Sequence, residues 1–271
     1  MVARRAQKDR LARTFDRSAP LYERGRPDYP DVAIRFAASR FGLGRGSVLV
    51  DLAAGTGKLT RALLATGSTI VAVEPMPGMR RVFRRVVPGV PVVDGRAEAI
   101  PLPTGFADAV FVGQAFHWFR GRHALREIAR VLRPGGVLVL VWNTRDDRVR
   151  WSRSLTEIIR DAGGPRQKPY RSEGDWRRSF RGVTSPFTAL RWKTFSHTQT
   201  ATPSTFIARV LSVSHVAVQS PAVRRRIARE VREVLATDPR TRGRKVVELP
   251  YTTEVYFTRR RPERRTRARS A

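Results

Sequence analysis

Two carboxylates and two glycines in the first third of the chain have the types and spacing of a ligand site. Asp51 lies near the end of a short apolar run, and Gly55 and Gly57 follow it in a turn of small residues. Glycine lets the backbone approach a ligand where a Cβ would collide, and the amides that begin the next helix then face that ligand. Glu74 follows the next apolar run, where a carboxylate can accept two hydrogen bonds from a ribose diol. These residues predict a site for a ligand that contains a nucleoside.

Two nucleotide-binding loops match this turn poorly. A phosphate-binding P-loop needs Ser or Thr directly after Gly-Lys, but Leu59 follows Lys58. A dinucleotide-binding loop needs a third glycine three residues after the second, and Thr60 stands there. A turn that packs the helix on the strand and binds nothing is a further alternative.

Three more residues follow the second and third expected strands, at the edge where an adenine would lie. Met76 could pack against an adenine face, although methionine is as common a filler of cores. The backbone of Ala97 and the carboxylate of Glu98 are candidate contacts beside the same pocket. Alternatively, the polar groups of this loop only satisfy its own backbone hydrogen bonds and contact no ligand.

A histidine beside aromatic residues follows the fourth expected strand, where a transferred group should meet its acceptor. His117 is the best single candidate for a base or for a hydrogen bond to substrate, because imidazole titrates near neutral pH. A lone histidine next to Trp118 can also be structural. Upstream, Tyr22, Arg26 and Tyr29 belong to a proline-rich arm that could cover a ligand or pack on the domain.

These residues need a scaffold that brings several strand ends to one edge. Apolar runs predict strands, and apolar spacings of three and four predict the helices between them. Besides the run before Gly55, the strands expected are 68–73, 90–93, 106–112, 137–142, 190–198 and 246–258. The helices expected begin at Asp31 and after Gly57, pass through Leu125, Ile128 and Leu132, and cover 151–162, 205–218 and 223–235. This alternation predicts an α/β fold with a Rossmann-like doubly wound sheet.

The composition excludes several classes of function. The 271 residues include no cysteine, so disulfides, thiolate metal sites and iron–sulfur clusters are excluded; the four histidines lack metal-ligand spacing, and no metal is expected. No apolar run could span a membrane, and the charged N-terminus lacks a secretory core, so we expect a cytoplasmic protein without a membrane partner. The net charge of +30 suggests nucleic acid, but the arginines are scattered through every segment, as codon bias would also produce.

Five motifs occur in the order and spacing of one family. They are residues 51–57, Glu74, and residues 97–101, 114–119 and 130–136. Together they resemble the class I S-adenosylmethionine-dependent methyltransferases. The His-Trp-Phe segment and residues 141–143 resemble the small-molecule branch, methyltransferase type 11, that includes trans-aconitate methyltransferase-like proteins. Ala53 departs from the family's usual first glycine, and its methyl group is tolerable if its φ is negative.

The resemblance implies more detail about the fold. The sheet should have seven strands with the last one antiparallel, and a helical insertion should precede the final strands. We expect an N-terminal arm in residues 1–30 and a Rossmann-like core that binds S-adenosylmethionine in residues 31–145. Residues 146–258 should hold the insertion and the final strands of the same domain, and residues 259–271 a disordered basic tail.

The resemblance also implies S-adenosyl-L-methionine as the cofactor. Its expected contacts are Asp51, Ala53, Gly55, Gly57, Glu74, Met76, Ala97, Glu98 and Gln114. The expected contacts of the acceptor are Tyr22, Arg26, Tyr29, His117, Trp118 and Trp142, with His117 as the candidate catalytic residue.

Methyl transfer from a sulfonium depends more on alignment in a dry pocket than on an acid–base pair. We therefore expect methylation of a small molecule at a carboxylate or a hydroxyl. A carboxylate acceptor would need an arginine fork, for which Arg26 and Arg145 lie on suitable loops.

Two alternatives stay open at this point. One is a nucleic-acid-associated methyltransferase, although the Asn/Asp-Pro-Pro-Tyr/Phe segment of DNA amino methylases is missing after the fourth strand. The other is a non-catalytic regulator that binds S-adenosylmethionine. The chain should act as a monomer or a homodimer, with a small molecule as its main partner.

Overall fold

The centre of the molecule is a seven-stranded sheet with the strand order β3-β2-β1-β4-β5-β7-β6. The computed structural model describes residue 16 and residues 18–162, 175–182 and 185–262. The strands are β1 Val48–Leu52, β2 Thr69–Val73, β3 Val92–Val93, β4 Ala107–Gly113, β5 Leu132–Arg145, β6 Arg191–Ala201 and β7 Val247–Arg259. The first five run parallel, and β7 is antiparallel to both β5 and β6. The predicted fold class is confirmed.

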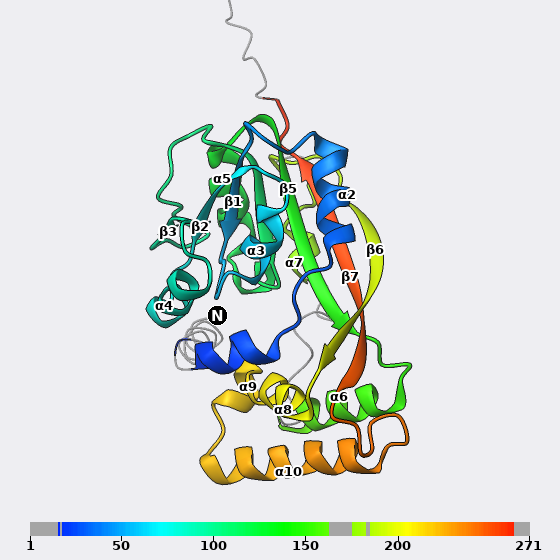
Figure 1. Cartoon of the computed structure of the whole chain (residues 1–271). Helices are drawn as coiled ribbons and strands as arrows, with labels where there is room; N and C mark the ends of the chain where they lie inside the picture. The colour runs from blue at the N-terminus through cyan, green and yellow to red at the C-terminus, as the bar shows by residue number, and fades with distance from the viewer. Residues whose placement is uncertain (1–15, 17, 163–174, 183–184, 263–271) are drawn as a thin grey trace, which may run out of the picture.

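Helices cover both faces of the parallel strands (Figure 1). On one face lie α2 Asp31–Phe41, α3 Lys58–Leu64 and α4 Pro77–Val86, and on the other η1 Phe116–Trp118, α5 Gly121–Val131 and α7 Asp175–Arg178. Strands buried on both faces are apolar along their whole length. Asp51 is therefore an exception that needs a reason, because it is a fully buried carboxylate in β1.

The ends of two elements follow from local chemistry. Gly42 ends α2 in the left-handed region, with φ 64°, and its N–H donates to the carbonyls of Ala38 and Ser39. The predicted helix through Leu132 ends one residue earlier, at Val131, and Leu132 already belongs to β5. The Arg-Pro-Gly-Gly segment then lies inside β5, where the pairing with β4 shifts register and Gly135 has φ 78°.

A group of helices lies beyond the carboxyl ends of β1 and β5 (Figure 1). It consists of α6 Arg150–Ala162, α8 Pro203–Leu211, α9 Ser214–Ala217 and α10 Pro221–Thr237, which share a hydrophobic core with the start of β7. The insertion was expected before the final strands, but α8, α9 and α10 lie between β6 and β7. The single helix expected at 205–218 is two helices, because Val213 between them has an extended backbone, with φ −69° and ψ 132°. At this break the Ser212 hydroxyl donates to the Arg209 carbonyl.

The two ends of the described chain are both held by the sheet domain. Residues 18–25 form a short helix, here called the arm helix, whose Ala19 packs on α4. The disordered tail was expected from residue 259, but Arg259 ends β7, and the N–H of Arg260 donates to the Gly136 carbonyl at 2.8 Å. The rest of the expected tail, residues 263–271, lies outside the described residues. No helix in the described part of the chain has the length and apolarity needed to cross a membrane.

Candidate active site

The small-residue turn after β1 contains three residues in the left-handed region, at Ala53, Gly55 and Gly57. A Cβ on Gly55 would meet no protein atom within 4 Å, so open space adjoins the loop there. A Cβ on Gly57 would lie 2.6 Å from Cγ2 of Val87, so packing of α4 also requires this glycine. Ala53 has φ 59°, whereas we expected a negative angle; its methyl group therefore carries backbone strain.

Glu74 follows β2 and fixes this loop. Its Oε2 accepts a hydrogen bond from the Gly55 N–H at 2.8 Å, and its Oε1 accepts one from the Met76 N–H at 2.9 Å. The side chain is 4% exposed, and burial raises the pKa of its carboxyl to about 7, although both N–H donors oppose that rise. One carboxylate thus organises the glycine loop and the start of α4.

Asp51 is the second buried carboxylate of the site. Its Oδ2 accepts a hydrogen bond from Oγ1 of Thr60 at 2.5 Å, and its Oδ1 is buried without a partner. Burial raises the pKa of this carboxyl to about 7 as well. Sequence reasoning missed Thr60 as a site residue, because the only signal was its place in the first turn of the helix that follows the loop.

The other expected cofactor contacts lie along the carboxyl edge of the sheet. Met76 immediately precedes α4, and Ala97 is buried beside the strand ends. The carboxylate of Glu98 accepts a hydrogen bond from the N–H of Arg120 at 2.6 Å, so this side chain ties two loops together. Met76 and Glu98 therefore lie in the loops that follow β2 and β3.

Gln114 follows β4 and is the other non-glycine residue with positive φ, at 58°, in the described chain. Its backbone N–H donates to the Val141 carbonyl, and its Nε2 donates to the Asn143 carbonyl at 2.9 Å. Asn143 in turn donates from Nδ2 to the Asp28 carbonyl at 3.0 Å, which connects β5 to the arm. Two strained residues, Ala53 and Gln114, thus lie at the ends of the neighbouring strands β1 and β4, as is common at functional sites.

Ion pairs attach the arm to the start of α3. Nζ of Lys58 lies 3.0 Å from Oδ1 of Asp28, and Nη2 of Arg61 lies 2.8 Å from Oε1 of Glu23. Although desolvation raises it, the two cations hold the pKa of Asp28 below its usual value. The arm helix crosses beneath the strand ends in Figure 1, where it is blue.

The arm brings its three expected contacts to this edge. The guanidinium of Arg26 lies 4.9 Å from the ring centroid of Tyr22. Tyr29 is buried, and its hydroxyl occupies the space where a Cβ on Gly113 would stand, at the end of β4. Burial raises the pKa of Tyr29 well above 10, so the hydroxyl stays protonated and can only donate or accept a hydrogen bond.

The aromatic candidates are divided between two environments. His117 and Trp118 are partly exposed on η1, with their ring centroids 5.2 Å apart. Trp142 is 4% exposed in the sheet core, where its ring centroid lies 4.7 Å from that of Trp176 on α7. Trp142 therefore supports the face that carries η1 and α7.

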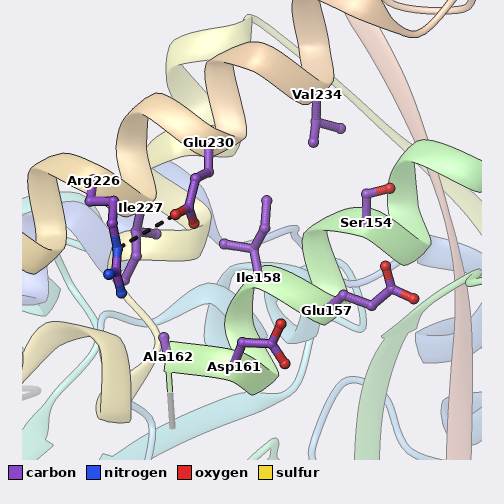
Figure 2. A pocket seen from close by; sticks show the side chains of 9 residues that line it. All are labelled: Ser154, Glu157, Ile158, Asp161, Ala162, Arg226, Ile227, Glu230 and Val234. Atoms are coloured by element: carbon purple, nitrogen blue, oxygen red, sulfur yellow. Dashed lines mark ion pairs between the residues drawn. The ribbon is translucent and has the colours of Figure 1, made fainter. Parts of the chain in front are cut away.

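A separate groove lies between α6 and α10 (Figure 2). Its volume is about 380 Å³, and Glu157, Asp161 and Glu230 give it an acidic lining. Arg226 pairs with Glu230 across 3.5 Å. None of its lining residues belongs to the glycine loop or the arm, so this groove is distinct from the strand-end site. No cluster of described residues has the ligands for a metal ion.

Comparison with known proteins agrees with this geometry. The family model described as a methyltransferase domain matches residues 50–140. An uncharacterized methyltransferase of Mycobacterium tuberculosis is 40% identical over 246 residues, which cover 90% of this chain and 94% of the relative. An uncharacterized methyltransferase-like protein of Schizosaccharomyces pombe is 32% identical over 92% of this chain and 96% of its own length.

The fold agrees with a solved structure as well. A candidate type II methyltransferase from Anaeromyxobacter dehalogenans superposes with a TM-score of 0.63 and 22% identity, over 87% of this chain and 97% of that one. At this identity the similarity supports the fold alone, and the family assignment rests on the sequence relatives. By its sequence relatives and its strand order, the chain belongs to the methyltransferase family and is an enzyme with the class I methyltransferase fold.

Proposed function

We propose that the enzyme transfers a methyl group from S-adenosylmethionine to a small molecule, at a carboxylate or a hydroxyl. The observation that supports this most is the pair of buried carboxylates, Asp51 and Glu74, beside the open space at Gly55. They lie at the carboxyl ends of β1 and β2, and β1 borders β4, where the strand order reverses and outside whose strand ends ligands of doubly wound sheets bind.

The residues present fit the nucleoside of this donor. A carboxylate oxygen can accept more than one hydrogen bond, so Glu74 keeps acceptor capacity for a ribose diol after it binds two backbone N–H groups. Oδ1 of Asp51 is buried and without a partner, which makes it a second acceptor. Met76, Ala97, Glu98 and Gln114 would hold the remainder of the donor.

The acceptor side consists of the arm and η1. When bound, the donor supplies a methyl group on a sulfonium and leaves as a neutral thioether. The protein then has to align the acceptor and exclude water, which the buried Tyr29 and the ion-paired arm support. His117 is the candidate base for a hydroxyl acceptor, whereas a carboxylate acceptor needs no base.

A two-part experiment tests this function. Calorimetric titration with S-adenosylhomocysteine should show binding to the wild type and weaker binding to Asp51→Asn. The protein should then transfer a labelled methyl group from the donor into the small-molecule fraction of a cell extract. Failure to bind S-adenosylhomocysteine, or label found in nucleic acid alone, would contradict the proposal.

A further inference from the structure

Three arginines from distant parts of the chain come together where the arm meets α8. Arg26 follows the arm helix, Arg145 ends β5, and Arg209 lies on α8 and is 8% exposed. The arm contacts α8 so closely that a Cβ on Gly25 would overlap the backbone of Arg209. The charge of Arg209 acts on both of the other guanidiniums. We call these three residues the arginine cluster.

The arginine cluster has buried donors without acceptors. The nitrogens concerned are Nε of Arg26, and Nε and Nη1 of both Arg145 and Arg209. Nη2 of Arg145 donates to Oγ1 of Thr156 at 2.9 Å, and that hydroxyl donates to Oδ1 of Asp147 at 2.8 Å. The charge of Asp147 also acts on Arg145, but the two groups form no direct ion pair. Within the described part of the chain, none of the three guanidiniums forms an ion pair with a carboxylate.

Such a cluster costs free energy in the folded protein. Burial and the neighbouring charge of Arg209 lower the pKa of Arg26 to about 9 and that of Arg145 to about 10. Both groups still carry their charge at neutral pH, so they repel one another in a poorly solvated place. The phenol of Tyr251 on β7 is buried there without a partner too. These donors match an anion that the chain itself does not provide.

The arginine cluster adjoins the proposed methyl-transfer site through one residue. The charges of Arg26 and Asp51 both act on Tyr29, whose hydroxyl lies at the end of β4. The arginine cluster and the buried carboxylate of β1 thus both lie within electrostatic range of this tyrosine.

We propose that Arg26, Arg145 and Arg209 bind an oxyanion of the acceptor, either a carboxylate or a phosphate, so that the acceptor is an acidic small molecule. The inference rests on the proposed function, because it assigns the anion to the acceptor. Guanidinium forks bind the paired oxygens of both groups, and their donors here are already buried.

Two probes distinguish the two oxyanions. Citrate and inorganic phosphate are titrated separately into protein that is saturated with S-adenosylhomocysteine, so that the carboxylate of the donor product is already in place. Wild-type protein should bind at least one probe. Tighter binding of citrate identifies a carboxylate acceptor, and tighter binding of phosphate identifies a phosphorylated one.

Two arginine variants make the test specific. Arg209→Met keeps the aliphatic part of the side chain but removes the guanidinium and its charge. It should weaken binding of the probe about tenfold or more, as expected for loss of a charge-assisted hydrogen bond. It should leave affinity for S-adenosylhomocysteine unchanged and raise the unfolding temperature without added anion, because repulsion is relieved. Arg226→Met, in the groove of Figure 2, controls for the high net charge and should bind the probes like the wild type.

Three results would overturn the inference. They are equal binding of the probes by Arg209→Met and wild type, no binding of either probe, and binding that occurs only without S-adenosylhomocysteine. The last result would mean that the cluster holds the cofactor's own carboxylate. If S-adenosylhomocysteine itself does not bind, the proposed function fails instead, and titration of citrate alone still measures the anion site.

Discussion

Replacement of Glu74 by glutamine changes the charge and one acceptor of the site but almost no volume. The carboxylate accepts one backbone N–H at each oxygen, from Gly55 at 2.8 Å and from Met76 at 2.9 Å. A glutamine amide has a single oxygen, so its NH₂ group must face one of these two donors. Glu74→Gln therefore loses one charge-assisted hydrogen bond and leaves a buried donor without an acceptor.

The hydrogen bonds proposed from the ribose diol to Glu74 set the magnitude that we expect for binding, because the bonds from Gly55 and Met76 exist with and without ligand and stabilise the loop itself. A hydrogen bond to a charged group contributes about 1.5–3 kcal/mol, so loss of the carboxylate acceptor in Glu74→Gln should weaken binding of S-adenosylhomocysteine roughly 10- to 150-fold. The difference in affinity between Glu74→Gln and wild type should shrink below about pH 6. The pKa of Glu74 is about 7, and a protonated Glu74, like glutamine, has lost its charge and one acceptor oxygen. Calorimetric titration at several pH values measures both effects.

A nearby exposed carboxylate provides the control. Asp94 pairs at 2.9 Å with Arg80, which also donates to the Glu74 carbonyl, but the side chain of Asp94 is 69% exposed. Asp94→Asn should change affinity by less than about 1 kcal/mol, as surface ion pairs contribute little. If Glu74→Gln folds cooperatively and binds S-adenosylhomocysteine as tightly as Asp94→Asn, the assignment of Glu74 to the cofactor site is wrong.

Three further predictions follow from the same loop. Ala53→Gly should raise the free energy of unfolding by about 0.5–1 kcal/mol, because glycine adopts φ 59° without strain; a lower value in urea denaturation would contradict it. Gly57→Ala should destabilise the protein by about 1–3 kcal/mol through overlap with α4, measured in the same way. Asp51 and Glu74 hold protons in the folded protein between about pH 4 and 7 that the unfolded chain releases, so stability without cofactor should fall as pH rises through this window. In thermal unfolding measured across this pH range, the stability of Asp51→Asn should fall less steeply with pH than that of the wild type. An identical pH profile would exclude Asp51 as a cause of this pH dependence.

The sequence by itself determined the order of the elements and the position of the glycine loop. Apolar runs, their spacing and small-residue turns are local properties of the chain. They therefore sufficed to place strands β1, β2 and β4. The two carboxylates were found for the same reason, since each lies at the end of a run that is buried in the sheet. The antiparallel last strand came from the family resemblance and is confirmed.

Only the tertiary structure decided which remote side chains meet. Arg209 carried no signal among the many arginines, and it joins Arg26 and Arg145 because α8 packs under the arm beyond the strand ends. The positive φ of Ala53 was equally hidden, since this backbone angle depends on the hydrogen bonds that the N–H groups of Ala53 and Ala54 donate to the Val73 carbonyl at the end of β2. Spacing along the chain encodes local structure, whereas these contacts depend on how helices pack over the edge of the sheet.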